Sequence, residues 1–364
     1  MTLHIYNPFS SRVKGDRIVL PVNMAYRFTN DKIPSLDQSI VHSKNSLGFR
    51  GPNAPANFAE HLTIITVGGS TSECCYLSDG KTWPHHLSNR LLQSFDKLWV
   101  NNAGLDGHST FGHTVLMRDY ITDLQPKVVV FLVGINDVGR AGPQRRDNRI
   151  LKHSDEGGIK GVLKTGANYS EIMLVCLNII RARQAHDRGI DHRNIDLKTR
   201  TSLEQTAEQI DDALAAHSPA FLAGYQQRLE NLIRIAQVSN IEPVLVTQPS
   251  LLGMGIDPKT GINLATLETF EERSGALDWK LLEKYNGITR QVAADGDIPL
   301  IDLAKKMPKS SEFFYDFYHF NDAGAEVVAE IIASDLAAVL EDKFPGFQRE
   351  KERVASALAR KVAP

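Results

Sequence analysis

Short apolar runs alternate with helix-spaced apolar stripes along the chain from Leu62 onward. The runs are rich in Val, Ile and Leu, as expected for strands buried on both faces, and they span 62–67, 98–102, 128–133, 244–247 and 298–301. The stripes recur every three or four residues, as on one face of a helix, and they span 83–92, 110–124, 278–294 and a long segment after Asn321. Asn321 itself is typical of a helix N-cap.

This alternation predicts the fold class. Strands that alternate with helices indicate an α/β protein, in which a parallel sheet is covered by helices on both sides. The carboxyl ends of parallel strands meet at one edge of the sheet, and ligands bind at that edge. We therefore expect the functional residues in the turns that follow the strands.

Regions outside this alternation set the expected domain organisation. Residues 1–60 are rich in Pro, Asn and Ser and have too few apolar residues for a core, so we predict an extended arm with one short strand. The main domain is expected at 61–342, with a helical insertion at 140–218 and a long pocket loop at 248–275. A charged helix is expected at 343–364. The insertion is interpreted either as a cap over the site or as an addition that only enlarges the core.

Composition and charge exclude several classes of protein. The chain has 364 residues, 42% of them hydrophobic and 23% charged, which indicates a folded globular protein. Its 41 Lys and Arg balance 43 Asp and Glu, and no dense basic run suggests a nucleic-acid partner. The longest apolar run, 128–133, is too short to span a bilayer.

Compartment and redox state follow from what the sequence lacks. No signal-peptide pattern opens the chain, which favours the cytoplasm, whereas a periplasmic or membrane-tethered location is expected if an N-terminal anchor was removed. Cys74, Cys75 and Cys176 form neither a metal-ligand spacing nor a disulfide framework. We expect them to be small core residues.

Polar turns follow the predicted strands and precede the last helix. The first strand ends in Gly68-Gly69-Ser70, whose glycines leave room for a substrate beside the serine. Gly107 lies in the turn after the second strand, Asn136 follows the third, and an Asp316-Phe317-Tyr318-His319 stretch precedes the last long helix. We expect these turns to converge on the ligand-binding edge of the sheet.

Together these residues supply the parts needed for acyl transfer. Ser70 is a candidate nucleophile, and His319 is a candidate base because an imidazole exchanges protons near neutral pH. Asp316 is one helical turn before His319 and can hold the other ring nitrogen. The backbone N–H groups of Ser70 and Gly107 and the side-chain amide of Asn136 are candidate oxyanion donors.

Each of these assignments has an alternative. Ser72 is a second candidate nucleophile, Gly104 competes with Gly107, and Asn136 can instead cap the segment that follows it. Asp137 is interpreted as structural. His108 and Gln248 are candidate substrate contacts, although a surface role for His108 fits equally well.

Two other kinds of site are disfavoured. The His and carboxylate spacing matches no metal site, so no metal and no other cofactor are expected. The glycine-rich turn at 104–107 lacks the full dinucleotide-binding pattern and carries an acidic residue, which disfavours phosphate.

The four polar turns, in this order, resemble the SGNH (GDSL-type) hydrolase family. The resemblance covers about 60–140 and 240–342, and by position it assigns Ser70, Gly107, Asn136, Asp316 and His319 to the family's motifs. It implies a flavodoxin-like three-layer α/β/α sandwich and metal-free ester hydrolysis. Gly69 departs from the family pattern, because the GDSL signature has an aspartate there. The arm that ends near Arg50 is similar to that of bacterial members with an N-terminal membrane anchor.

The sequence therefore predicts a serine esterase that acts through an acyl-enzyme on a small-molecule or saccharide ester. A sugar O-acetyl group is favoured, by analogy alone. One alternative is an acyltransferase that uses the same site with an alcohol acceptor in place of water. The other is a non-catalytic binding module on the same fold. Oligomeric state has no sequence signal.

Overall fold

A computed structural model of the chain describes residues 13–14, 17–18, 20–143, 147, 192, 194–269 and 273–350. Its centre is a five-stranded parallel sheet in the order β6-β5-β7-β8-β9. The strands are β5 (Leu62–Gly68), β6 (Leu98–Asn102), β7 (Val128–Leu132), β8 (Glu242–Val246) and β9 (Leu300–Ile301). All five lie within two residues of the predicted runs. The predicted parallel sheet is confirmed.

The first strand of the sheet lies between the second and the third. β5 pairs with β6 on one side, through Leu62 and Leu98, and with β7 on the other, through Ile64 and Val128. The strand order therefore reverses at β5, and a crevice forms at the carboxyl ends of strands on either side of such a switch point. The segments after β5, β6 and β7 all begin at this edge.

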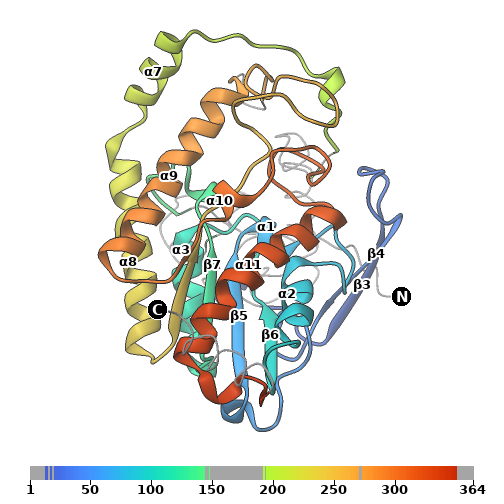
Figure 1. Cartoon of the computed structure of the whole chain (residues 1–364), viewed down its shortest axis with the longest axis vertical. Helices are drawn as coiled ribbons and strands as arrows, with labels where there is room; N and C mark the ends of the chain where they lie inside the picture. The colour runs from blue at the N-terminus through green and yellow to red at the C-terminus, as the bar shows by residue number, and fades with distance from the viewer. Residues whose placement is uncertain are drawn as a thin grey trace, which may run out of the picture.

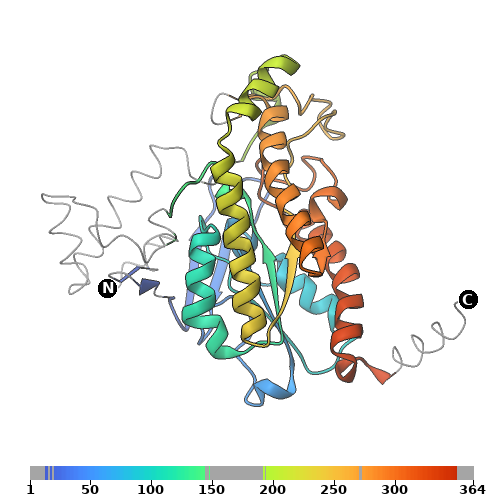
Figure 2. The ribbon, with the colours of Figure 1, turned by 90° about the vertical axis from the view of Figure 1, so that its left-hand side faces the viewer.

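Helices cover both faces of the sheet, which confirms the three-layer α/β/α sandwich. In Figure 1 the sheet is seen behind α2 and α11, and Figure 2 shows α3 and α8 on the opposite face. The first layer is α2 (Trp83–Leu91), α10 (Leu303–Lys306) and α11 (Asp322–Lys343). The second layer is α3 (Thr110–Leu116), α8 (Pro219–Val238) and α9 (Gly275–Asp295).

Alternate strand residues enter the two cores, as the two-residue period of a strand requires. Ile64 and Val130 belong to the apolar cluster under α2 and α11, whereas Ile65 and Phe131 belong to the cluster under α3, α8 and α9. All four side chains are buried. Burial on both sides explains why these strands appear in the sequence as continuous apolar runs.

The remaining elements are short, apart from α7. They are the helix α1 (Ser70–Glu73), the π-helical turn η2 (Met117–Ile121) with α4 (Thr122–Leu124) after α3, and α7 (Ala207–Ala216). The 3-10 turns are η1 (Phe58–Glu60), η3 (Ile135–Asp137), η5 (Leu197–Thr199) and η6 (Pro345–Phe347). The single helix predicted at 110–124 thus contains a π turn. The predicted cap is present, since the Asn321 side chain accepts from the Gly324 N–H at 2.9 Å.

The arm contains more strand than the one short strand predicted. β3 (Met24–Thr29) and β4 (Ser39–Lys44) form an antiparallel hairpin, and β1 (Val13–Lys14) pairs with β2 (Arg17–Ile18). In β3 the exposure of side chains alternates from residue to residue. Phe28 contacts Tyr76 edge to face, with ring centroids 5.6 Å apart. The hairpin thus packs on the main domain through one apolar face.

Parts of the predicted insertion and of the terminal helix lie outside the described residues. Residues 170–184 and 351–364 are among them, and so is Cys176. Within the predicted insertion, α7 begins after Thr206, whose side chain and that of Gln209 form a capping box. The described residues of the predicted loop at 248–275 form isolated bridges but no strand, and α9 begins at its end. The proposed domain bounds stay predictions.

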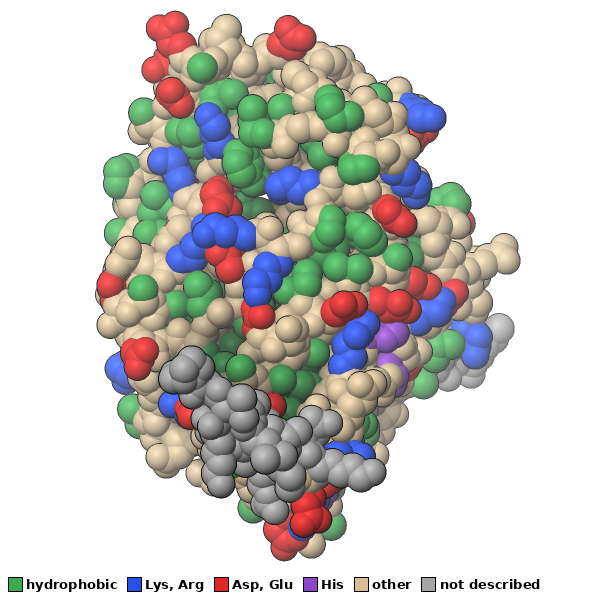
Figure 3. All heavy atoms as spheres, viewed as in Figure 1, with side chains coloured by type: hydrophobic (Ala, Val, Ile, Leu, Met, Phe, Trp, Pro, Cys, Tyr) green, Lys and Arg blue, Asp and Glu red, His purple; other side chains and the backbone are tan. Residues whose placement is uncertain are grey.

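The surface carries mixed charge. In Figure 3 Lys and Arg side chains are interspersed with Asp and Glu on the face over α11, without a large area of one sign. Within the described part of the chain, no helix is both long and apolar enough to cross a bilayer. Cys74 and Cys75 are buried, as the sequence predicts for small core residues.

Candidate active site

Ser70 is the first residue of α1, directly after the central strand β5. Gly69 makes the turn between them, and Cys74 ends the helix with a left-handed backbone at φ 53°. Ser70 is buried but for 7% of its surface. The alternative nucleophile Ser72 is fully buried, and its hydroxyl lies against Gly68. Ser70 therefore has a hydroxyl directed to the sheet edge, whereas Ser72 faces the interior.

Three side chains form a hydrogen-bonded chain at this edge. His319 Nε2 lies 2.7 Å from Ser70 Oγ, and His319 Nδ1 lies 2.6 Å from Asp316 Oδ2. The other carboxylate oxygen of Asp316 accepts the backbone N–H groups of Tyr318 and His319, at 2.8 and 2.7 Å. Both oxygens are thus held, and the local loop orients the carboxylate toward the ring.

The charge of Asp316 is maintained despite its burial. Burial alone raises the pKa of this carboxyl, but the adjacent His319 and the N–H donors favour the anion more strongly, so its pKa is lowered. An ionised Asp316 accepts a hydrogen from Nδ1 of His319. That contact leaves Nε2 of the ring as an acceptor for the Ser70 hydroxyl.

The turn after β6 carries the two candidate oxyanion glycines. Gly107 has a positive φ of 72°, which glycine adopts at little cost. The loop is tied to β5, because the Leu105 N–H donates to the Gly68 carbonyl at 3.0 Å. A Cβ on the rival Gly104 would lie 2.4 Å from the backbone nitrogen of Glu73. Gly104 is therefore required for close packing against α1.

Asn136 lies in η3, after β7, with its amide beside the turn that carries Ser70. Its Nδ2 donates to the His108 carbonyl at 2.9 Å. A Cβ on Gly69 would lie 2.2 Å from the same nitrogen. The amide of Asn136 therefore lies directly over the residue that precedes Ser70.

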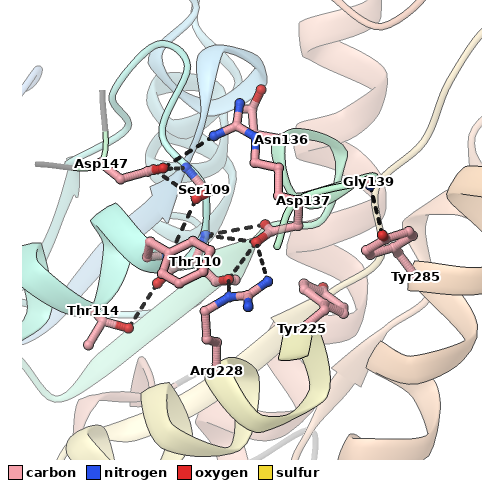
Figure 4. Close-up of polar contacts among 12 residues, drawn as sticks. Ser109, Thr110, Thr114, Asn136, Asp137, Gly139, Asp147, Tyr225, Arg228 and Tyr285 are labelled. Carbon is pink, nitrogen blue, oxygen red and sulfur yellow. Dashed lines mark hydrogen bonds and ion pairs between the residues drawn. The ribbon is translucent and has the colours of Figure 1, made fainter. Parts of the chain in front are cut away.

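Asp137 anchors the η3 turn to α3 and α8. It is fully buried and accepts the backbone N–H and the hydroxyl of Thr110, and Arg228 of α8 donates to it at 3.2 Å. Figure 4 shows Asp137 directed into this cluster, with Gly139 bonded to the Tyr285 hydroxyl nearby. This agrees with the structural role inferred for Asp137 from the sequence.

The two candidate substrate contacts are enclosed by protein. His108 is 1% exposed, which contradicts the alternative of a surface role, because its ring faces His113 in the interior. Gln248 accepts from the Thr71 hydroxyl and donates to the Pro249 carbonyl. A role for either side chain in contacting substrate stays a prediction.

The structure brings further residues to the site that sequence reasoning missed. Arg50 reaches the segment after α1 and donates to the carbonyls of Glu73, Cys74 and Leu77 at 2.7–2.9 Å. His192 lies beside His319, with ring centroids 4.1 Å apart. Nothing in the sequence indicates where the Arg50 side chain goes, and His192 belongs to no recognisable motif.

One group of side chains has donors close enough for a metal ion. Donor atoms of His192, Asp316 and His319 lie within 4.8 Å of one another. Both ring nitrogens of His319 and both oxygens of Asp316 are, however, engaged in the hydrogen bonds described above. A metal ion at this position would have to break the link between His319 and Ser70, so these residues do not fit a catalytic metal.

Comparison with known proteins assigns the family. The model of the GDSL-like lipase/acylhydrolase family matches residues 65–327. No curated protein matches the sequence. Solved structures with a similar chain course include a lipase/acylhydrolase from Enterococcus faecalis, at 16% identity and a TM-score of 0.42 over 76% of this chain and 95% of that one. The acetylxylan esterase Axe2 from Geobacillus stearothermophilus is also similar, at 14% identity and a TM-score of 0.43. The match covers 75% of this chain and 93% of that chain.

The family match spans the turn that carries Ser70 after β5 and the Asp316–His319 pair, and it covers well over half of the chain. The chain belongs to the GDSL-like lipase/acylhydrolase family and is an ester hydrolase.

Proposed function

We propose that the chain is a serine esterase in which Ser70, His319 and Asp316 form the catalytic triad. The observation that carries the proposal is the hydrogen-bonded chain from Ser70 Oγ through His319 to Asp316. A serine hydroxyl is a poor nucleophile until an adjacent base takes its proton, and His319 Nε2 is within reach to do so. Asp316 holds the tautomer and stabilises the imidazolium that forms.

The reaction proceeds through an acyl-enzyme. Ser70 Oγ attacks the ester carbonyl while His319 accepts its proton, and a tetrahedral intermediate forms. The N–H groups of Ser70 and Gly107 and Nδ2 of Asn136 stabilise its oxyanion, each donor contributing roughly 3–4 kcal/mol. His319 then protonates the departing alcohol. Water, deprotonated by His319, attacks the acyl group and releases the carboxylic acid and Ser70.

A small recess lies beside Ser70 and His319. It has about 180 Å³ of empty space, some of it open to solvent. Apart from Ser70 and His319, it is lined by Thr71, Cys74, Leu77, Tyr315 and Phe320. We propose a short ester such as acetate, carried by a polar alcohol of the saccharide class.

The test is hydrolysis of p-nitrophenyl esters of increasing acyl length. Wild type is expected to cleave acetate best, and Ser70→Ala is expected to lose activity. Ser72→Ala is the matched control, since it removes a buried hydroxyl two residues away and leaves the chain from Ser70 to Asp316 intact. Activity retained in Ser70→Ala would overturn the assignment of the nucleophile.

The two alternatives have distinct readouts. An acyltransferase transfers the acyl group to an added alcohol in preference to water, which product analysis detects. A binding module neither cleaves an ester nor reacts with a fluorophosphonate probe at Ser70.

A further inference from the structure

Glu73 is a buried carboxylate at the end of α1, the short helix that begins with Ser70. Its side chain is 2% exposed. One carboxylate oxygen accepts a hydrogen bond from the Asp106 backbone N–H at 2.5 Å, and Asp106 directly precedes Gly107. Glu73 therefore joins the helix that carries Ser70 to the turn that carries Gly107.

The contact with Glu73 is made at a turn that runs from Leu105 to His108. The His108 N–H donates to the Leu105 carbonyl at 3.0 Å and closes the turn. Gly107 occupies the third position with a φ of 72°, as glycine does in a type II turn. Asp106 lies between two peptide planes, one with its own N–H and one with the Gly107 N–H. A hydrogen bond that holds the first plane therefore restrains the second.

The beginning of the same loop is also attached to α1. Asn102 Nδ2 donates to the Ser72 carbonyl at 2.7 Å. The backbone approaches closely as well, since a Cβ on Gly104 would lie 2.4 Å from the Glu73 nitrogen. These contacts place the start of the loop against α1, and the side chain of Glu73 extends the attachment to the residue before Gly107.

The other oxygen of Glu73 pairs with Lys44, the last residue of β4 in the arm. Nζ of Lys44 lies 3.1 Å from Oε1 of Glu73, and the Lys44 side chain is 5% exposed. A buried carboxylate is stable as an anion when a cation pairs with it. An anionic acceptor also forms a stronger hydrogen bond with a backbone N–H than a neutral acceptor does. Lys44 thus favours the form of Glu73 that binds the Asp106 N–H most strongly.

The residues on both sides of Lys44 attach the end of β4 to the main domain. The Ser43 N–H donates to Asp79 Oδ2 at 2.9 Å, in the segment that follows α1. Asn45 Nδ2 donates to Asn101 Oδ1 of β6 at 2.8 Å. Because its neighbours are held in this way, Lys44 is directed into the interior, and the arm supplies a charged group beside α1.

We propose that Glu73 is a positioning residue that fixes the Gly107 N–H relative to the Ser70 N–H. Lys44 of the arm holds Glu73 in its anionic form. The two N–H groups follow different strands, so their spacing depends on how α1 and the turn are joined. Such donors lower the barrier when they are aimed at the place where negative charge develops. This inference rests on the proposed function, in which both N–H groups bind the oxyanion, and it makes the arm part of the catalytic apparatus.

The first experiment compares two double variants that both lack the ion pair. Lys44→Met/Glu73→Gln keeps a side-chain oxygen that can accept from the Asp106 N–H, whereas Lys44→Met/Glu73→Leu has no acceptor there. The leucine variant is expected to lose about 10- to 10²-fold in kcat with little change in KM, and the glutamine variant is expected to keep most of its kcat. Stability is expected to follow the opposite order, because the glutamine variant buries a polar amide beside an apolar side chain. A kcat that follows stability, or an unchanged kcat in the leucine variant, would overturn the proposal.

A thiono ester tests whether the loss of kcat arises at the oxyanion. Sulfur accepts hydrogen bonds more weakly than oxygen, so the oxyanion donors contribute less to cleavage of this substrate. The loss in the leucine variant is therefore expected to be smaller for the thiono ester than for the matching ester, and an equal loss would contradict the proposal. The control is Lys81→Met, which removes a lysine that pairs with Asp37 of the arm and Asp322 of α11. It should leave kcat unchanged.

The geometry can also be measured without ester hydrolysis. In ¹⁵N-labelled protein, the NMR amide signals of Asp106 and Gly107 are expected to shift in the leucine variant, and the Asp106 amide is expected to exchange faster with solvent. The control variant should leave both signals in place. Unchanged signals and exchange in the leucine variant would refute the positioning role. If wild type cleaves no ester and Ser70 does not react with a fluorophosphonate, the proposed function fails, while these signals still decide whether Glu73 fixes the turn.

Discussion

A side chain on Gly69 would occupy the place of the Asn136 amide, since a Cβ built there lies 2.2 Å from Nδ2. Asn136 extends from the turn after β7, and Gly69 precedes Ser70 after β5. The aspartate of the GDSL signature therefore could not replace Gly69 here without displacing Asn136. This contact explains why the departure from the signature is compatible with the rest of the site.

We expect Gly69→Ala to impair catalysis more than stability. The clashing atom is the end of a side chain, so Asn136 can turn away from the His108 carbonyl, and its oxyanion bond is then lost. The expected fall in kcat is about 10²-fold. Gly68→Ala is the contrasting variant, because its Cβ would lie 2.5 Å from the Leu132 backbone oxygen and must disturb the sheet. Measurements of thermal unfolding and of kcat distinguish the two variants. An equal loss of stability in Gly69→Ala and Gly68→Ala would contradict this account.

Asp316→Asn is expected to lower kcat by roughly 10³–10⁴-fold. An asparagine has one acceptor oxygen, so it cannot accept both from His319 Nδ1 and from the backbone N–H groups of the loop. Steady-state kinetics measure the effect. The control is Asp335→Asn, which removes a carboxylate of α11 that pairs with Lys306 of α10. This variant should leave kcat unchanged.

Asn136→Ala is expected to lower kcat by about 10²–10³-fold with little change in KM, because we propose that its amide stabilises the developing oxyanion. Asn321→Ala serves as a control for the loss of an asparagine. It removes the N-cap of α11, so it should reduce the free energy of unfolding by about 1 kcal/mol without changing kcat. A rise in KM alone for Asn136→Ala would indicate ground-state binding instead.

Arg50→Met is expected to reduce the free energy of unfolding by about 3–5 kcal/mol. The guanidinium is 3% exposed, and its removal leaves buried carbonyls after α1 without their donor. Urea unfolding measures the change. Arg27→Met, on the exposed side of β3, should stay within about 0.5 kcal/mol of wild type.

The raised pKa of His192 predicts a dependence of stability on pH. Its pKa is raised in the folded protein, so its ionic contribution is fully present below the unfolded value near ~6.5 and is lost as pH rises through the folded value. The difference in unfolding free energy between wild type and His192→Gln should therefore be larger at pH 6 than at pH 9. A difference that does not vary with pH would indicate a purely steric role.

Much of the fold was predictable because its signals are local. A strand buried on both faces must be apolar along its length, and the five runs from 62–67 to 298–301 carry that pattern. The spacing of Asp316 and His319 was equally informative, because one loop alone places the carboxylate against the ring. The arm shows how a local signal can be overlooked. Met24, Tyr26 and Phe28 alternate with other residues, yet we predicted one short strand where a hairpin forms.

The sequence by itself therefore determined the strands of the central sheet and the turn residues that follow them, since each depends on neighbours within a few positions. Only the tertiary structure decided what lies against these turns. Arg50 reaches the end of α1, His192 reaches His319, and Asn136 covers Gly69. These contacts join segments far apart in the chain. They depend on how whole elements pack, and no periodicity or spacing in the sequence records that packing.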